Sequence, residues 1–520
     1  MLGVFTAEEM RRLDQRAITE LGIPGATLME NAGRGAAAAI VGALQALGAP
    51  RRGARVVIVC GKGGNGGDGF VVARWLKRHG ARPTVLLVPV PADVGGDAGR
   101  KLEELRRAGI RPRPFTADRA TTDLLGRAHV VVDALLGTGS RGAPEGAVSS
   151  AIEAINAAGR PVVALDIPSG LSANTGTHGG AVIRAAMTLT FAGLKRGLVV
   201  SPGAELAGRV AVIPIGVPDH EVARGVTTFL LEPEDVAANF PRRARAGHKG
   251  TYGHLLLVAG SLGKTGAAAL GSMAALRSGV GLVTVATPAS QQPVVAGLVL
   301  EAMTEPLPET SAKTLALKAR EAIRELAGSR DAVANGPAIG LDHETTEVAR
   351  ALARELPQPL VIDADGLSAL AGHLDLLREA PAPRCLTPHP GEMARMLGAR
   401  VDEIQRDRIE VTREFATRYR VYLVLKGARS VIGTPDGRVF VNPTGNPGMA
   451  TGGTGDVLTG MLGAFLARGL DPGAALLSAV YLHGSAGDVA VERLGEESLV
   501  ARDVIAAIAE AFARLRGDRG

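Results

Sequence analysis

Two glycine-rich segments, each containing an aspartate, constrain the fold of this chain more than any other feature. The first spans residues 61–70 and follows the apolar run 56–60; the second spans residues 446–460 and leads into an apolar stretch that ends at Leu466. A strand that stops in glycines and restarts as a helix exposes backbone N–H groups at the positive helix end, where phosphate binds. The sequence therefore predicts two nucleotide-binding domains in one chain.

Length and composition agree with this prediction and argue against other classes. A chain of 520 residues is too long for one hydrophobic core and fits two or more domains. The net charge is +6, but aromatic residues make up only 3% of the chain. Because base-stacking surfaces need aromatics, we expect no nucleic-acid partner. Cys60 and Cys385 are the only cysteines and have no metal-ligand neighbours at a useful spacing, which favours a reducing compartment.

We expect a cytoplasmic protein with no membrane partner. Residues 6–9 read as a helix-capping box and are followed by apolar residues at helical spacing, which is not typical of a signal peptide. No uncharged apolar run in the sequence approaches the roughly 18–20 residues that a membrane span requires.

Strands and helices alternate along both halves of the chain. Continuous apolar strands separated by helices indicate a parallel sheet covered on both faces, so each half is predicted to be a three-layer α/β domain. A proline-containing, loop-like segment places the boundary at about residues 217–235. In the first half we predict strands at 55–60, 84–90, 129–135, 161–167, 187–191 and 210–215, with helices such as 68–79 and 148–158. In the second half we predict strands at 254–259, 281–286, 332–335, 360–363, 384–387 and 421–426, and a hairpin of 430–433 and 438–442.

The first glycine segment does not indicate an ordinary NAD redox site. Gly61, Gly63 and Gly66 match the dinucleotide fingerprint formally, but that match alone is weak. A redox site needs an acidic residue for the ribose at the end of the second strand, whereas the next acid in this chain is Asp93.

Polar residues follow three predicted strands of the first half. Asn65 follows one strand, Asp133 closes the next, and Asp166 closes a third, with Ser169 shortly after it. Because the carboxyl ends of parallel strands converge on one crevice, the oxygens of Asn65, Asp133 and Ser169 would suit a hard cation. The alternative is that Asp133 and Asp166 only cap the turns that follow them.

The second glycine segment suggests phosphoryl chemistry. Asp456 would lie in the first turn of a helix, where it can accept a proton from a substrate hydroxyl, and the preceding glycine amides can stabilise a phosphoryl group. Asp363 and Asp365 end a strand, where they could reach a nucleotide or Mg²⁺. His389 lies between two prolines at a strand end, and we expect it to be functional. The alternative for Asp456 is a helix-capping role alone.

The first half resembles the NAD(P)H-hydrate epimerase domain over roughly residues 1–216. The matching segments are NAGRG at 31–35, GKGGNGGDGFVVAR, VDALLGTG and DIPSG. The resemblance implies that Asn65, Asp133 and Ser169 bind potassium and that Asp166 contacts the substrate as the candidate catalytic residue. The family loop often carries two asparagines, where this chain has Gly64 and Asn65. The implied contacts to the hydrated nucleotide are Gly64, Asn65, Gly66, Gly67, Asp68, Gly137, Thr138, Gly139, Ser140, Arg141, Gly142, Ala143 and Asp166.

The second half resembles the ribokinase-like fold over roughly residues 225–515. TPHPGE, KGARS and GMATGGTGD narrow this resemblance to the ADP-dependent NAD(P)H-hydrate dehydratases. The implied nucleotide contacts are Lys426, Gly427, Ala428, Arg429, Ser430, Gly453, Thr454 and Gly455. The implied contacts to the hydrate are Gly336 or its neighbour Gly340, His389, the catalytic Asp456 and one alanine, Ala267, for which Ala268 and Ala269 are the alternatives.

Taken together, the chain resembles the bifunctional NAD(P)H-hydrate repair family, with a Rossmann-like epimerase domain at 1–220 and a ribokinase-like dehydratase domain at 225–520. The resemblance implies NADHX and NADPHX as substrates, ADP converted to AMP, K⁺ in the first domain and Mg²⁺ with ADP in the second. We also expect a homo-oligomer. One alternative is a small-molecule kinase of the hydroxymethylpyrimidine or sugar type with an accessory nucleotide-binding domain. Another is a nucleotide-sensing scaffold that binds without turnover.

Overall fold

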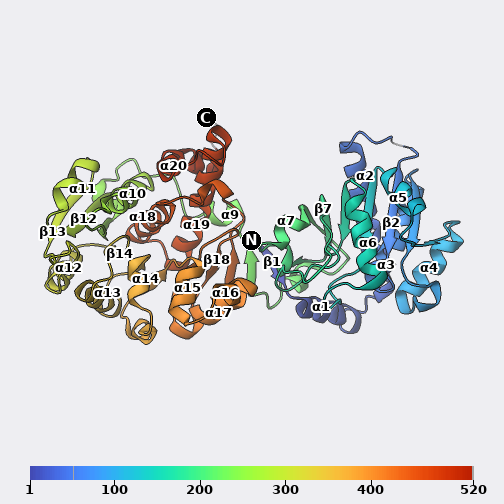
Figure 1. The fold of residues 1–520 in the computed structure, drawn as a ribbon, viewed down its shortest axis with the longest axis horizontal. Helices are drawn as coiled ribbons and strands as arrows, with labels where there is room; N and C mark the ends of the chain where they lie inside the picture. Colours follow the sequence, from blue (N-terminus) through green and yellow to red (C-terminus); the bar gives the residue numbers. More distant parts are fainter. Residues whose placement is uncertain (51, 518–520) are drawn as a thin grey trace. The chain divides into compact units, whose positions relative to one another are not determined.

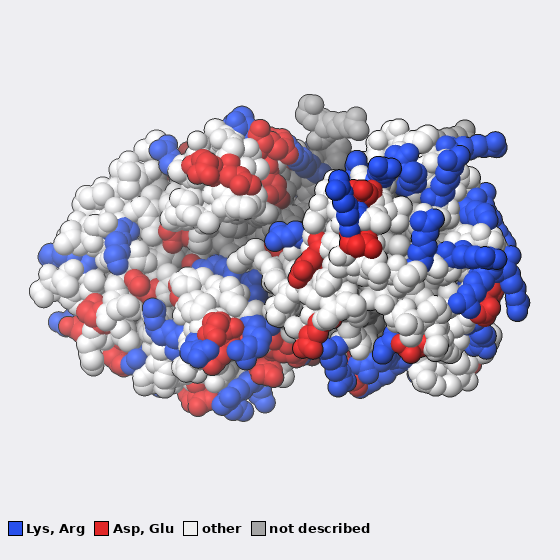
Figure 2. All heavy atoms as spheres, turned by 45° about the vertical axis from the view of Figure 1, so that its right-hand side comes forward, with Lys and Arg blue, Asp and Glu red and all other residues white. Residues whose placement is uncertain are grey.

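A computed structural model of the chain describes residues 1–50 and 52–517. It divides into two compact units, Gly3–Val226 and Thr227–Gly520, and Met1–Leu2 group with the second. Each unit is a sheet with helices on both of its faces (Figure 1). Figure 2 shows Lys and Arg side chains spread over the visible surface of both units, mixed with Asp and Glu.

The sheet of the N-terminal unit is parallel throughout. Its spatial order, β4–β3–β2–β5–β6–β7–β9, starts near the middle and winds outward in both directions, which is the doubly wound arrangement of dinucleotide-binding folds. The carboxyl ends of β2, β5 and β6 therefore meet at one crevice. The strands are β2 (Arg55–Cys60), β3 (Arg82–Leu87), β4 (Arg113–Pro114), β5 (Val130–Ala134), β6 (Val162–Leu165), β7 (Met187–Phe191) and β9 (Arg209–Ile213).

Alternate residues of β2 enter two separate cores, which gives this unit its three layers. Val56 and Ile58 pack with α2 (Gly25–Ala46) and α3 (Gly64–Arg78). Val57 and Val59 pack on the other face, with α5 (Arg119–Gly126) and α6 (Gly146–Ala157). The further helices used below are α1 (Ala7–Thr19) and α4 (Gly96–Arg107).

The C-terminal unit is built on a mixed sheet. Its order is β13–β12–β11–β14–β15–β16–β17–β18–β19–β10, parallel from β13 to β17, while β17, β18 and β19 are antiparallel neighbours. The predicted hairpin is therefore present. The strands are β10 (Thr228–Leu230), β11 (His254–Val258), β12 (Leu282–Pro288), β13 (Met303–Leu307), β14 (Ala332–Asn335), β15 (Leu360–Ile362), β16 (Arg384–Leu386), β17 (Tyr422–Leu425), β18 (Val431–Gly433) and β19 (Val439–Val441).

Helices cover both faces of this sheet (Figure 1). One layer contains α10 (Thr265–Arg277), α18 (Thr454–Ala467), α19 (Pro472–Leu494) and α20 (Ala501–Arg516). The other contains α12 (Ala319–Ala327), α13 (His343–Glu355), α15 (Pro390–Leu397) and α17 (Arg408–Tyr419). By length and composition α19 could cross a membrane, but 67% of its most apolar window is buried inside the protein, which is typical of a core helix.

Helices α10 and α18 pack in close contact through glycine. A Cβ atom on Gly460 would lie 2.0 Å from the carbonyl oxygen of Gly271, so neither helix could keep its position if Gly460 carried a side chain. Every residue of α18 from Val457 to Ala467 is buried. The N-terminal turn of α18 packs against the middle of α10, where a Cβ atom on Gly271 would lie 3.4 Å from the carbonyl oxygen of Asp456.

Candidate active sites

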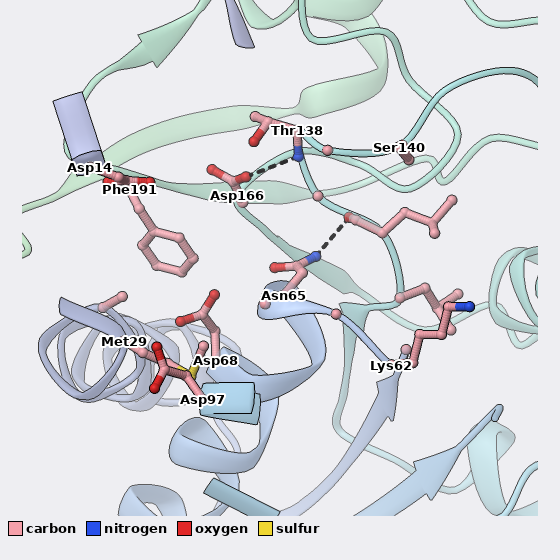
Figure 3. A pocket seen from close by; sticks show the side chains of 18 of the residues that line it. Asp14, Met29, Lys62, Asn65, Asp68, Asp97, Thr138, Ser140, Asp166 and Phe191 are labelled. Atoms are coloured by element: carbon pink, nitrogen blue, oxygen red, sulfur yellow. Dashed lines mark hydrogen bonds between the residues drawn. The ribbon is translucent and has the colours of Figure 1, made fainter. Parts of the chain in front are cut away.

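The N-terminal unit contains a cavity of about 860 Å³ at the carboxyl ends of β2, β5, β6 and β7. Asn65 and Asp68 line it from α3, and Thr138 and Asp166 line it from the loops after β5 and β6 (Figure 3). Two predicted clusters that are about 70 residues apart in sequence are thus brought together. The predicted substrate residues in its lining are Gly64, Asn65, Asp68, Gly137, Thr138, Gly139, Ser140 and Asp166.

Other predicted residues lie outside this lining, namely Gly66, Gly67, Arg141, Gly142 and Ala143. A Cβ atom on Gly66 would lie 2.0 Å from the carbonyl oxygen of Gly61, and one on Gly67 would lie 2.7 Å from Met29 Sδ. These two glycines make room for the turn and for α2 behind it. Residues 141–143 lie in the same loop between Ser140 and Glu145, which both line the cavity.

Helix α3 begins at Gly64, four residues earlier than the predicted helix start at 68. Glycine counts against a helix in sequence patterns, but here it is required by close packing, since a Cβ atom on Gly69 would lie 2.8 Å from both Cys60 Sγ and Ala134 Cβ. No side chain caps this end of α3, so its first N–H groups are available to an anionic ligand.

Two of the three predicted potassium ligands, Asp133 and Ser169, are bonded to each other, and both Ser169 and Asn65 contact the backbone of Leu136. Asp133 is fully buried and accepts hydrogen bonds from Ser169 Oγ at 2.6 Å and from Ser169 N at 2.8 Å. Asn65 Nδ2 donates to the carbonyl oxygens of Leu136 at 2.7 Å and Leu165 at 3.1 Å, while Asn65 Oδ1 is buried with no partner among the described residues. Burial raises the pKa of Asp133 to about 6. A buried carboxyl group and an unpaired buried amide oxygen are both of the ligand types that suit a hard cation.

Asp166 has two partners, one of which the sequence analysis missed. Its Oδ1 lies 2.6 Å from Lys195 Nζ, and its Oδ2 accepts a hydrogen bond from Thr138 N at 3.3 Å. Asp14, on α1, also lines the cavity. Lys195 ends the two-residue strand β8 (Leu194–Lys195), and neither it nor Asp14 belongs to a motif. The only available signal was that Lys195 closely follows the apolar run of β7.

In the C-terminal unit, Asp456 lies in the first turn of α18 near a buried ion pair. Lys426 Nζ is 2.9 Å from Asp363 Oδ1 and 3.7 Å from Glu392 Oε2, and Thr459 Oγ1 donates to Asp363 Oδ2 at 2.7 Å. Burial raises the pKa of Asp456 to about 7; the negative charge of Asp363 acts in the same direction, and Lys426 opposes it. A carboxyl group that titrates near neutrality suits a general base.

Asp363 and Asp365, predicted to reach a nucleotide or Mg²⁺, make their bonds within the protein. Asp363 is bonded as described above, and Asp365 Oδ2 accepts a hydrogen bond from Gly340 N at 2.9 Å. Gly336 has φ +127°, and a Cβ atom on it would lie 1.9 Å from the carbonyl oxygen of Asp363. The two predicted glycines therefore pack directly against the strand end that carries these acids.

His389 and the predicted alanine lie at the starts of two other helices, α15 and α10. His389 caps α15, because its Nδ1 accepts hydrogen bonds from the N–H groups of Gly391 at 3.0 Å and Glu392 at 3.2 Å. Its side chain is 56% exposed, and its Nε2 lies 3.6 Å from Glu392 Oε1. In the first turn of α10, Ala267 is half-buried whereas Ala268 is fully buried, so the structure favours Ala267 over Ala268 as a ligand contact.

The two predicted nucleotide segments adjoin each other. A Cβ atom on Gly455 would lie 3.5 Å from Lys426 Nζ, so the N-terminus of α18 and the segment 426–430 share one site. Gly427 has φ +143°, a conformation that favours glycine. Arg408, which the sequence analysis missed, donates to the carbonyl oxygens of Lys426 at 3.2 Å and Ala428 at 2.5 Å. Its buried guanidinium thus fixes the backbone of this segment.

Both units thus present a glycine-rich helix start with carboxyl groups beside it, which defines a two-site protein built for phosphate-bearing ligands. Comparison with known proteins gives its family. The NAD(P)H-hydrate dehydratase family profile matches residues 255–510, and the profile described as YjeF-related protein N-terminus matches residues 25–197.

Relatives extend over the whole chain. A bifunctional NAD(P)H-hydrate repair enzyme of Moorella thermoacetica is 45% identical over 96% of this chain and 95% of its own length. The corresponding protein of Escherichia coli is 33% identical over 97% of this chain and 93% of its own. The chain belongs to the family of bifunctional NAD(P)H-hydrate repair enzymes, as the sequence motifs predicted.

Among solved structures, the chain is similar to the ADP/ATP-dependent NAD(P)H-hydrate dehydratase of Bacillus subtilis, co-crystallized with ATP/Mg²⁺. The identity is 32% and the TM-score 0.48, and the match covers 55% of this chain and 98% of the Bacillus chain.

Proposed function

We propose that this chain repairs hydrated nicotinamide nucleotides in two steps. The N-terminal unit interconverts the R and S forms of NADHX and NADPHX. The C-terminal unit converts the S form to NADH or NADPH while ADP becomes AMP and phosphate. The observation that carries the proposal is the position of Asp456, a carboxyl group with a pKa of about 7 at the glycine-rich start of α18.

Asp456 accepts the proton of the substrate hydroxyl, whose oxygen then attacks the β-phosphorus of ADP, and AMP leaves. The backbone N–H groups at 453–455 and the ammonium of Lys426 face the transferring phosphoryl group and stabilise its charge. Phosphate is a better leaving group than hydroxide, so elimination of phosphate and a ring proton restores the dihydropyridine. Gly336, Gly340, Ala267 and His389 are assigned to the hydrate, and residues 426–430 to the nucleotide.

Two cations belong to this proposal. K⁺ would be held by Asn65 Oδ1 and by Asp133, with Ser169 beside them, and would anchor the substrate phosphates above it. Mg²⁺ would accompany ADP and neutralise phosphate charge. Its ligands would be mainly phosphate oxygens, because the described residues contain no group of three or more His, Cys, Asp or Glu that could hold a metal ion.

One assay separates this proposal from its alternatives. The chain is incubated with a mixture of R- and S-NADHX, ADP and Mg²⁺, and the absorbance of restored NADH is followed. We expect complete recovery of both epimers. A small-molecule kinase would leave NADHX untouched and form a stable phosphate ester of another substrate, and a sensing scaffold would bind the nucleotides without turnover.

A further inference from the structure

Lys195 is a buried lysine whose ammonium group has a complete set of partners. Its residue is 1% exposed, and Nζ donates to Thr190 Oγ1 at 2.9 Å and to the carbonyl oxygen of Phe191 at 2.8 Å. The third partner is Asp166 Oδ1 at 2.6 Å. Burying an ammonium group is costly unless it is paired and hydrogen-bonded, so the position of this charge is fixed.

Asp166, the partner of Lys195, is held in an unusual conformation. Its φ is 65°, in the left-handed region that residues other than glycine rarely adopt. Such strain persists only where the surroundings hold the residue in place, and it clusters at functional sites. Here Lys195 holds one carboxylate oxygen and Thr138 N holds the other. The carboxylate is therefore fixed at the wall of the cavity.

A second carboxyl group, on Asp68, points into the same cavity from the other side (Figure 3). Among the described residues, Asp68 has no ion-pair partner. Burial raises the pKa of Asp68 well above its ordinary value, and the charges of Asp166 and Asp14 raise it further, while Lys195 opposes them. The pKa of Asp14, also at this cavity, is raised mainly by burial. Lys62 also lines the cavity, but it is Lys195 whose ammonium is bonded to Asp166.

We propose that Lys195 is a positioning residue of the epimerase reaction. Lys195 holds the carboxylate of Asp166 across the cavity from Asp68, so that the two carboxyl groups act on opposite faces of the hydrated ring. This proposal rests on the epimerase function proposed above for the N-terminal unit.

The chemistry uses the two groups in turn. The hydrated carbon carries a hydroxyl group and is bonded to the ring nitrogen. Asp68 gives its proton to that hydroxyl, the C–O bond breaks, water leaves, and the nitrogen lone pair forms a C=N⁺ bond. Water then adds to the other face, Asp166 takes its proton, and the lone pair returns to nitrogen. Proton return from Asp166 to Asp68 through water resets the site, and no oxidant or reductant is required.

The same unit offers a matched control for a structural role. Lys101 is also buried, at 5% exposure, and its ammonium is paired with Glu30 at 2.8 Å and Glu104 at 3.2 Å. It does not line the cavity. Replacing Lys101 removes a buried ammonium and its ion pairs without touching Asp166 or Asp68.

The test compares K195M, K195R and K101M in the full-length chain, with R- and S-NADHX and excess ADP. NADH should appear in a fast phase, from dehydration of S, and a slow phase limited by conversion of R to S. We expect K195M to lower kcat of the slow phase on the order of 10²-fold, the cost of a misplaced catalytic group. KM and the fast phase should stay within about threefold, as for a loss confined to the transition state. K195R should recover part of the loss, and K101M should match the wild type.

Equal slow phases in K195M and the wild type would overturn the proposal. So would a higher KM at unchanged kcat, or a K101M chain as slow as K195M, which would reveal a purely structural effect. Thermal unfolding followed by the fluorescence of Trp75, the single tryptophan, checks that the N-terminal unit of each variant is folded. A wild-type chain that shows no slow phase faster than spontaneous epimerisation would instead refute the epimerase function itself.

Discussion

At the scale of single residues, the ionisation of Asp456 depends on its neighbours. Its pKa of about 7 reflects burial first, then repulsion from Asp363, with Lys426 acting against both. Asp456 must be ionised to act as a base, so dehydratase kcat/KM should rise with pH through about 7. In Asp363→Asn the repulsion is lost and Lys426 loses the nearer of its two acidic partners. Both changes lower the pKa of Asp456. The acid limb of the pH–rate profile should therefore move to lower pH, and an unchanged limb would refute this coupling.

The raised pKa of Asp133 leads to a second prediction at the scale of single residues. Its folded pKa of about 6 lies above the value of about 3.9 expected in the unfolded chain. The folded state therefore holds the proton more tightly. As pH rises from about 4 to 6, ionisation of Asp133 lowers the free energy of unfolding by roughly 3 kcal/mol in total. A potassium ion that pairs with the carboxylate would restore that stability above pH 6.

We expect K⁺, but not the same concentration of choline, to raise the unfolding temperature of the N-terminal unit at pH 7.5. The effect should be much smaller at pH 5, where Asp133 is protonated. Trp75 fluorescence provides the measurement, and Asp133→Asn should abolish the difference between the two cations. A potassium effect that persists in Asp133→Asn would place the ion elsewhere.

Sequence reasoning found side chains that end strands but not those that act through long-range contacts. Asp133, Asp166 and Asp363 could be predicted because each lies at the end of an apolar strand or directly after it. Lys195 could not, because its one local signal, a position shortly after the apolar run of β7, does not indicate a partner; only the fold brings it against Asp166.

At the scale of elements, the packing of α10 against α18 places Asp456. Gly460→Ala would insert a methyl group into a space where a Cβ atom lies 2.0 Å from the carbonyl oxygen of Gly271, so the helices must move apart. We expect a loss of about 1–3 kcal/mol in the stability of the C-terminal unit, as for other overpacked cores. The dehydration rate should fall while epimerisation is unchanged. Gly266→Ala is the control for Gly460→Ala, because a Cβ atom on Gly266 would meet nothing within 4 Å. Gly469→Ala would be a poorer control, because the φ of Gly469 is +83°.

Elements with strong apolar runs could be predicted to within a few residues, whereas weak ones were missed. Strand β13 contains Glu305 and Pro306 and lies at the sheet edge, where proline is tolerated, so its sequence does not read as a strand. The start of α3 was placed too late because its glycines are selected by close contacts with other segments. Neither kind of information is present in local periodicity.

At the scale of the whole molecule, the two proposed activities are expected to be separable within full-length chains. The Asp166→Asn chain should dehydrate S-NADHX at the wild-type rate. It should not consume R-NADHX, except as fast as R-NADHX epimerises spontaneously. Asp456→Asn should interconvert the epimers and form no NADH. An equimolar mixture of the two variants should clear both epimers. If the Asp166→Asn chain alone consumed both epimers at equal rates, the division of labour between the units would be wrong.

Each unit also carries one cysteine, Cys60 in the first and Cys385 in the second, and both are fully buried. Burial raises the pKa of each thiol, so neither is reactive while its unit is folded. Alkylation of each native cysteine can therefore report the unfolding of the unit that contains it. Brief exposure to an alkylating reagent along a denaturant series, followed by mass spectrometry of the two cysteine peptides, should record the opening of each unit separately. Two labelling curves with different midpoints would show that the units unfold independently, and superimposable curves would show that they unfold as one.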